Sequence, residues 1–101
     1  MWIGAGRLVL DFYNNDKRAD KKRGLEELSR DLRKQFNLAL LEVADFEDLE
    51  RCVIGFSTVM PQVWPRQRAE DHIEQICKAI DEQAFARVTG SETELYSLGD
   101  F

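Results

Sequence analysis

The chain has 101 residues, of which 44% are hydrophobic and 33% are charged, a length and balance that suit one folded domain over residues 1–101. Its formal net charge of −5 at pH 7 argues against non-specific binding to nucleic acid or to an anionic membrane. No apolar run reaches the roughly 18 residues that a membrane-spanning helix needs, so we expect no contact with a membrane.

The first predicted element is a strand over residues 2–13, in which apolar side chains alternate. The even positions, which include Trp2, Leu8, Leu10 and Phe12, are predicted to form its buried face. The odd positions are predicted to be half-exposed. The polar residues 14–16 then favour a turn that ends the strand.

An amphipathic helix is predicted over residues 20–36. Its apolar side chains recur at spacings of three and four, which places them on one face: Leu25, Leu28, Leu32 and Phe36. Asp20 suits the N-cap position of this helix, and Asn37 suits the position at which it ends.

The rest of the chain is predicted to hold three strands and one further helix. A short strand over residues 38–43 leads through a solvated acidic loop, residues 44–50, to a strand over residues 51–60. A helix over residues 66–82 carries an apolar stripe that consists of Ala69, Ile73, Ile76 and Ile80. A last, polar strand over residues 87–97 is predicted to lie at a sheet edge.

The predicted order is strand, helix, strand, strand, helix, strand, which is the βαββαβ pattern of the ferredoxin-like fold. We therefore expect an α+β two-layer sandwich with an antiparallel four-stranded sheet. Both helices should cover one face of this sheet, because the two crossovers share a hand. The opposite face is then free for solvent, a partner or a ligand.

Several segments of the chain, taken in order, resemble the YlxP-like proteins, a small bacterial family of unknown function. They are MWIGAGRLVL at the start, RADKKR before the first helix, LSRDLRKQFNLALLEV and IGFSTV, and the most specific part is RKQFNLALLEV, residues 33–43. The resemblance implies a ferredoxin-like fold. Genes of this family often lie beside those for translation initiation and ribosome maturation, so it also hints at RNA or ribosome binding.

Few residues suit catalysis or metal binding. Cys52 and Cys77 are far apart and form no CxxC motif, which favours free thiols in a reducing cytoplasm. His72 is the one histidine and has no partner at a spacing typical of a triad or metal site. The acidic stretch of residues 42–50 lacks the central glycine of a calcium loop. We therefore expect a protein that is not an enzyme and has no metal or cofactor.

The charge of the chain is unevenly distributed. Residues 17–34 hold eight basic and four acidic side chains, a net charge of +4, so the remainder of the chain carries −9. The eight basic residues are the candidate anion-binding or RNA-binding set: Lys17, Arg18, Lys21, Lys22, Arg23, Arg30, Arg33 and Lys34.

Three interpretations of this basic segment stay open. The segment is solvated and paired locally, through Lys22 with Glu26 and Arg23 with Glu27; or it binds ribosomal RNA or the ribosome; or it binds an acidic protein surface. A helix N-terminus with additional cations is a natural anion site, which favours the last two.

The uncovered sheet face offers no aromatic pair from the first and third strands, so the base-stacking mode of RNA recognition is not expected. Its apolar residues instead favour a homodimer, in which Gly55 permits close approach. The predicted dimer face consists of Ile3, Val9, Val53 and Val59. Opposite charges would favour a register in which Arg30 or Arg33 meets residues 45–50 of the second copy.

Overall fold

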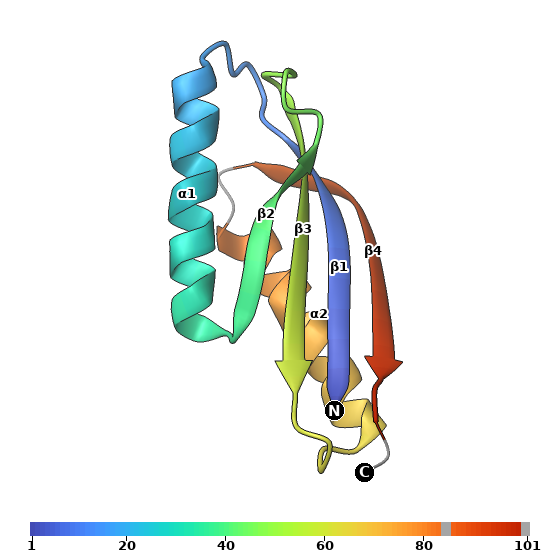
Figure 1. The fold of residues 1–101 in the computed structure, drawn as a ribbon. Helices are drawn as coiled ribbons and strands as arrows, with labels where there is room; N and C mark the ends of the chain where they lie inside the picture. Colours follow the sequence, from blue (N-terminus) through green and yellow to red (C-terminus); the bar gives the residue numbers. More distant parts are fainter. Residues whose placement is uncertain (84–85, 100–101) are drawn as a thin grey trace.

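The computed structural model describes residues 1–83 and 86–99 (Figure 1). Its elements are β1 (Trp2–Asp11), α1 (Arg18–Gln35), β2 (Leu38–Ala44), β3 (Arg51–Met60), α2 (Arg66–Gln83) and β4 (Arg87–Ser97). The strands form one four-stranded antiparallel sheet in the order β2-β3-β1-β4. The predicted ferredoxin-like fold is therefore confirmed. In the described part of the chain, no helix is long and apolar enough to cross a membrane.

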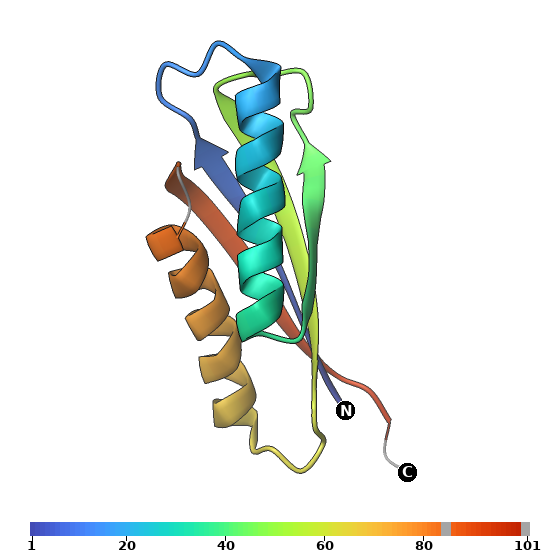
Figure 2. The same ribbon diagram turned by 90° about the vertical axis from the view of Figure 1, so that its left-hand side faces the viewer.

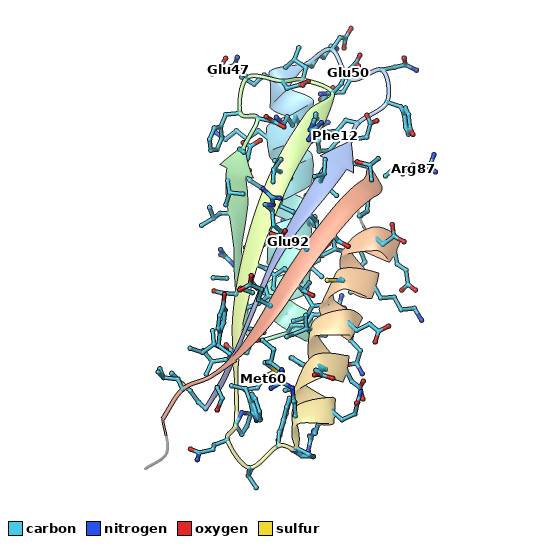
Figure 3. All side chains as sticks on the ribbon, turned by 90° about the vertical axis from the view of Figure 1, so that its right-hand side faces the viewer. Phe12, Glu47, Glu50, Met60, Arg87 and Glu92 are labelled. Atoms are coloured by element: carbon cyan, nitrogen blue, oxygen red, sulfur yellow. The ribbon has the colours of Figure 1, made fainter. Side chains whose placement is uncertain are left out.

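Both helices pack on the same face of the sheet, and Figure 2 shows them in front of it. The core lies between the helices and the even-numbered side chains of β1 and β3, as the alternation of these strands predicts. Its largest fully buried side chains are Leu8, Leu10, Leu32, Cys52, Ile54, Met60, Ile76 and Ile80. Figure 3 shows the opposite face, which no helix covers.

The start of α1 differs from the prediction. The helix begins at Arg18, and its N-cap is Lys17, whose side chain forms no capping hydrogen bond. The prediction that Asp20 is the N-cap is therefore wrong: Asp20 lies in the first turn and pairs with Arg23, three residues on, at 2.8 Å. The helix ends at Gln35, and the N–H of Phe36 donates to the carbonyl of Leu32 at 2.8 Å.

The two edges of the sheet differ in character. The edge strand β2 has the sequence LALLEVA and carries one charged residue, Glu42. The other edge strand, β4, has the sequence RVTGSETELYS and carries Arg87, Glu92 and Glu94. Charged side chains on an edge discourage pairing with another chain, so β4 is a protected edge and β2 is not.

Candidate functional site

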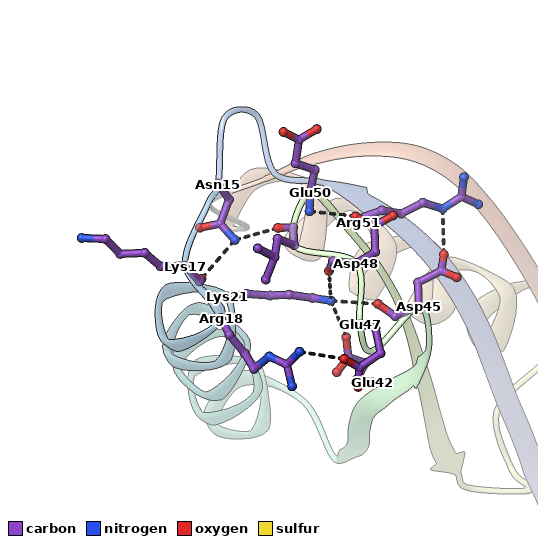
Figure 4. A network of polar contacts seen from close by, with 11 residues as sticks. Asn15, Lys17, Arg18, Lys21, Glu42, Asp45, Glu47, Asp48, Glu50 and Arg51 are labelled. Atoms are coloured by element: carbon purple, nitrogen blue, oxygen red, sulfur yellow. Dashed lines mark hydrogen bonds and ion pairs between the residues drawn. The ribbon is translucent and has the colours of Figure 1, made fainter.

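Lys21 of α1 lies in the interior, with 3% of its surface exposed. Its Nζ donates hydrogen bonds to the carbonyl oxygens of Asp45, at 3.0 Å, and Asp48, at 2.6 Å (Figure 4). It also lies 3.0 Å from Glu42 Oε2, in a geometry that makes an ion pair rather than a hydrogen bond. A buried ammonium needs this set of oxygens, because burial without partners is costly. The prediction that Lys21 belongs to an exposed anion site is therefore wrong.

The acidic loop, residues 45–50, is held against the start of α1 and the start of β3. Arg18 pairs with Glu47 at 2.7 Å, and Arg51 pairs with Asp45 at 2.9 Å (Figure 4). Asn15 Nδ2 also donates to the carbonyl of Leu49 at 2.6 Å. The sequence predicts a solvated loop. In the structure, basic side chains of the same chain bind it.

The remaining predicted basic residues are exposed on the surface. Arg23 pairs with Asp20 in place of the predicted Glu27. Arg30 lies 3.6 Å from its neighbour Asp31. The other four have no acidic side chain within 4.0 Å among residues 1–83 and 86–99; they are Lys17, Lys22, Arg33 and Lys34.

A groove of about 790 Å³ lies between α1 and β2 and brings most of these basic residues together. Its α1 wall contains six of the eight predicted site residues: Arg18, Lys21, Lys22, Arg30, Arg33 and Lys34. The structure places Lys17 and Arg23 outside this groove. The groove also takes in Ser29 and Glu26 of the same helix.

The charge of the groove is positive after its internal pairs are removed. Arg18 is neutralised by Glu47, and Lys21 is neutralised by Glu42. Lys22, Arg33 and Lys34, which have no such partner, then face one acidic side chain, Glu26, and Arg30 adds to them although it also pairs with Asp31 outside the groove. This surplus attracts an anionic ligand to the α1 side of the groove.

The floor and mouth of the groove are apolar. Leu25 and Leu40 line it from the core side, and Leu40 is buried. Leu41 and Phe46 also line it, although 61% and 56% of their surfaces remain exposed. Sequence reasoning missed both residues. The adjacent leucines 40 and 41 break the expected apolar and polar alternation of a half-exposed strand, which is the signal that could have found Leu41.

The uncovered sheet face is more polar than predicted, because charged side chains of β1 and β4, among them the pair Arg7 and Glu92, also lie on it. Val53 is 5% exposed, so the prediction that it contributes an exposed contact is wrong. Val59 is 50% exposed, whereas Ile3 and Val9 are half-buried. The reasoning also missed Tyr96, which pairs with Ile3 in the sheet and is 50% exposed.

Two other parts of the predicted dimer contact, Gly55 and the acidic loop, are occupied by side chains of the same chain. Val43 is 43% exposed and covers Gly55, since a Cβ added at Gly55 would lie 3.0 Å from its Cγ1. Gly55 is thus approached by its own chain. The acidic loop is likewise used within the chain, so the predicted pairing of Arg30 or Arg33 with this loop of a second copy is not supported.

The candidate nucleophiles have environments that disfavour reactivity. Burial, followed by the adjacent Glu42 carboxylate, raises the pKa of the Cys52 thiol to about 12. Burial also raises the pKa of Cys77. His72 packs edge-on against the rings of Phe36 and Trp64, and burial lowers its pKa. Within the described residues, no group of three or more histidine, cysteine or acidic side chains could hold a metal ion.

Comparisons with known proteins identify the fold and the family. One similar solved structure, provisionally named a chlorite dismutase, has a TM-score of 0.55 and 12% identity, over 96% of this chain and 45% of that one. Another, from Deinococcus radiodurans and provisionally named an antibiotic biosynthesis monooxygenase, has a TM-score of 0.42 and 17% identity, over 100% of this chain and 95% of that one.

The present chain thus spans less than half the length of the first of these proteins, and likeness at this identity concerns the fold alone. A search of curated proteins found no match. The family model described as "Protein of unknown function (DUF503)" matches residues 3–93, and the chain therefore belongs to this family.

Proposed function

We propose that this protein is a non-enzymatic interaction module of the YlxP-like type, and that it binds an acidic segment of another protein in the groove between α1 and β2. One observation carries the proposal: the groove joins an apolar floor to a wall with surplus positive charge. A ligand that uses both must carry apolar and acidic side chains. Two free cysteines fit a reducing compartment such as the cytoplasm.

The apolar part of the groove favours a protein ligand over RNA. Phosphate contacts need cations but gain nothing from exposed aliphatic side chains such as Leu41. Single-stranded RNA is held by base stacking on aromatic rings, and Phe46 is the one aromatic among the described residues that line the groove. Exposed aliphatic and aromatic side chains next to a charged rim are instead typical of protein interaction sites.

RNA or ribosome binding remains the second candidate function. The observation that favours it is the row of exposed cations along α1, which includes Lys17, Lys22, Arg33 and Lys34. These side chains could contact successive phosphates, and such binding would weaken steeply with salt.

The test measures fluorescence anisotropy of three labelled probes with the full chain. The first is a blocked nine-residue peptide in which isoleucine and glutamate alternate, the second replaces isoleucine by serine, and the third is a single-stranded RNA. We expect the first probe to bind and the second to bind about tenfold more weakly, which corresponds to about 1.4 kcal/mol for the apolar contacts. The RNA should show the weakest binding.

The double variant Arg33→Gln/Lys34→Gln should weaken binding of the first peptide about tenfold. The matched control Arg23→Gln/Lys78→Gln removes the same charge at two exposed positions outside the groove, on α1 and α2, and should leave binding unchanged. Equal losses in both double variants would refute the groove as the site. RNA binding that is lost in the groove variant, with no peptide binding, would replace this proposal by the second candidate.

A further inference from the structure

The free edge of β2 lies in the groove itself. Leu40, Leu41 and Glu42 are consecutive residues of this strand, and all three line the groove. Successive side chains of a strand point to opposite faces of the sheet. A groove that reaches three in a row must therefore run along the edge of the strand rather than over one face.

This edge has backbone groups available for pairing. β2 has a single neighbour in the sheet, β3, so alternate N–H and C=O groups of β2 point away from the sheet. Neither lysine nor proline protects the strand, whereas the opposite edge, β4, is polar and charged. In Figure 2, β2 lies to the right of α1, and no helix or strand lies beyond its outer edge.

The length of the groove suits an extended chain. Its lining on α1 runs from Arg18 to Lys34, which is sixteen residue steps along the helix. At about 1.5 Å per residue this is about 24 Å, the length of about seven extended residues at about 3.3 Å each. The register of β2 against β3 is regular over residues 38–42 and shifts between Glu42 and Ala44, so regular pairing along β2 covers about five residues.

Charge decides which chain can pair here. If two copies joined their β2 strands about a two-fold axis, the two α1 helices would lie side by side and bring Arg30, Arg33 and Lys34 of both copies together. Like charges at such a distance oppose association. A segment with acidic side chains would instead be attracted to the same wall.

We infer that an acidic, apolar segment of a partner protein binds by adding a strand to the free edge of β2 at residues 38–42; this rests on the proposed function. In this mode the main-chain hydrogen bonds to β2 supply affinity, and alternate side chains supply specificity. In a segment of alternating apolar and acidic residues, the acidic side chains are directed toward α1 and meet the basic wall. The apolar side chains are directed to the opposite face and lie beside Leu41, which is 61% exposed and faces that side.

Hydrogen exchange of the full chain, with and without the alternating isoleucine and glutamate peptide, tests the binding mode. At a peptide concentration about 100 times its Kd, β2 amides that are bonded only in the complex should exchange about 100-fold more slowly. The amides of β4, which form the opposite edge, serve as the internal control and should not change.

A second measurement uses two versions of the same peptide, one with N-methyl groups on the odd-numbered residues and one with them on the even-numbered residues. The version that lacks the N–H groups facing β2 should bind at least tenfold more weakly, whereas the other should bind almost normally. Strand addition would be refuted if the β2 amides gained no protection and the two methylated peptides bound equally well. If binding still depended on Arg33 and Lys34, the proposed function would stay intact. Absence of binding by the unmodified peptide would refute both.

Discussion

Replacement of Lys21 by methionine should destabilise the protein strongly, although lysine is usually a surface residue. The variant keeps the length of the side chain and removes the ammonium group. The carbonyls of Asp45 and Asp48 then lose a donor, and Glu42 loses its ion-pair partner. The acidic loop, residues 45–50, loses its buried attachment to α1.

The size of the effect follows from the burial of the two partners. Removal of one member of a buried ion pair costs about 3–5 kcal/mol. Since 23% of the Glu42 side chain is exposed, water can hydrate part of the remaining carboxylate, so we expect a loss of about 3 kcal/mol. For a domain of this size, a loss of 1 kcal/mol lowers Tm by about 4–8 °C, so we expect a decrease of about 12–24 °C.

Urea unfolding followed by circular dichroism measures the change in the free energy of unfolding. The neighbouring variant Lys22→Met is the control, because Lys22 is exposed and should change stability by less than about 0.5 kcal/mol. If Lys21→Met does not fold, the double variant Lys21→Met/Glu42→Leu should restore part of the stability, since no charge is left unpaired. A Lys21→Met protein as stable as Lys22→Met, with an unchanged m-value, would show that this ammonium is not buried.

Two further predictions concern a thiol and the uncovered face. The folded pKa of Cys52 is raised from 9.0 to about 12, so stability should be unaffected by this thiol below pH 9 and should fall as pH rises from 9 toward 12. A Cys52→Ala variant should show a smaller decline, because Cys77, whose pKa is also raised, still contributes. An identical pH profile for both proteins would contradict this prediction. The predicted homodimer through the uncovered face should be visible in light scattering as a mass of about twice 11.7 kDa. The variant Val59→Asp, which alters a half-exposed side chain of this face, should be a folded monomer. A constant mass of 11.7 kDa for the unmodified chain would exclude this dimer.

The sequence predicts the elements well where one periodicity dominates. Residues 51–60 and 87–97 are strands in both the prediction and the structure, because alternation and flanking turn residues mark their ends. The apolar stripe of α2 is likewise buried at each predicted position, Ala69, Ile73, Ile76 and Ile80. These patterns depend on local geometry alone, which is why one chain suffices to find them.

The position of Lys21 shows what local pattern cannot supply. Lys21 precedes Leu25, Leu28 and Leu32 at helical spacing, so it continues the apolar stripe by one turn toward the start of α1. This spacing was a usable signal of burial. Its partners, however, are backbone carbonyls of a loop that lies more than twenty residues away, and no side-chain pattern encodes them. Charge alone therefore suggested an anion site where the structure has an internal contact.

The segment DKRADKKR, residues 16–23, is thus explained mainly by the fold. The connection from β2 to β3 brings the acidic loop, residues 45–50, to the start of α1, where Arg18 and Lys21 bind it. Of the groove cations that remain for a ligand, Lys22 belongs to this segment, whereas Arg33 and Lys34 lie further along the helix. The internal pairs still serve the groove, because the loop that they fix carries Phe46 at its mouth. The segment DKRADKKR therefore shapes one end of the groove, and the last turns of α1 supply most of the charge that a ligand meets.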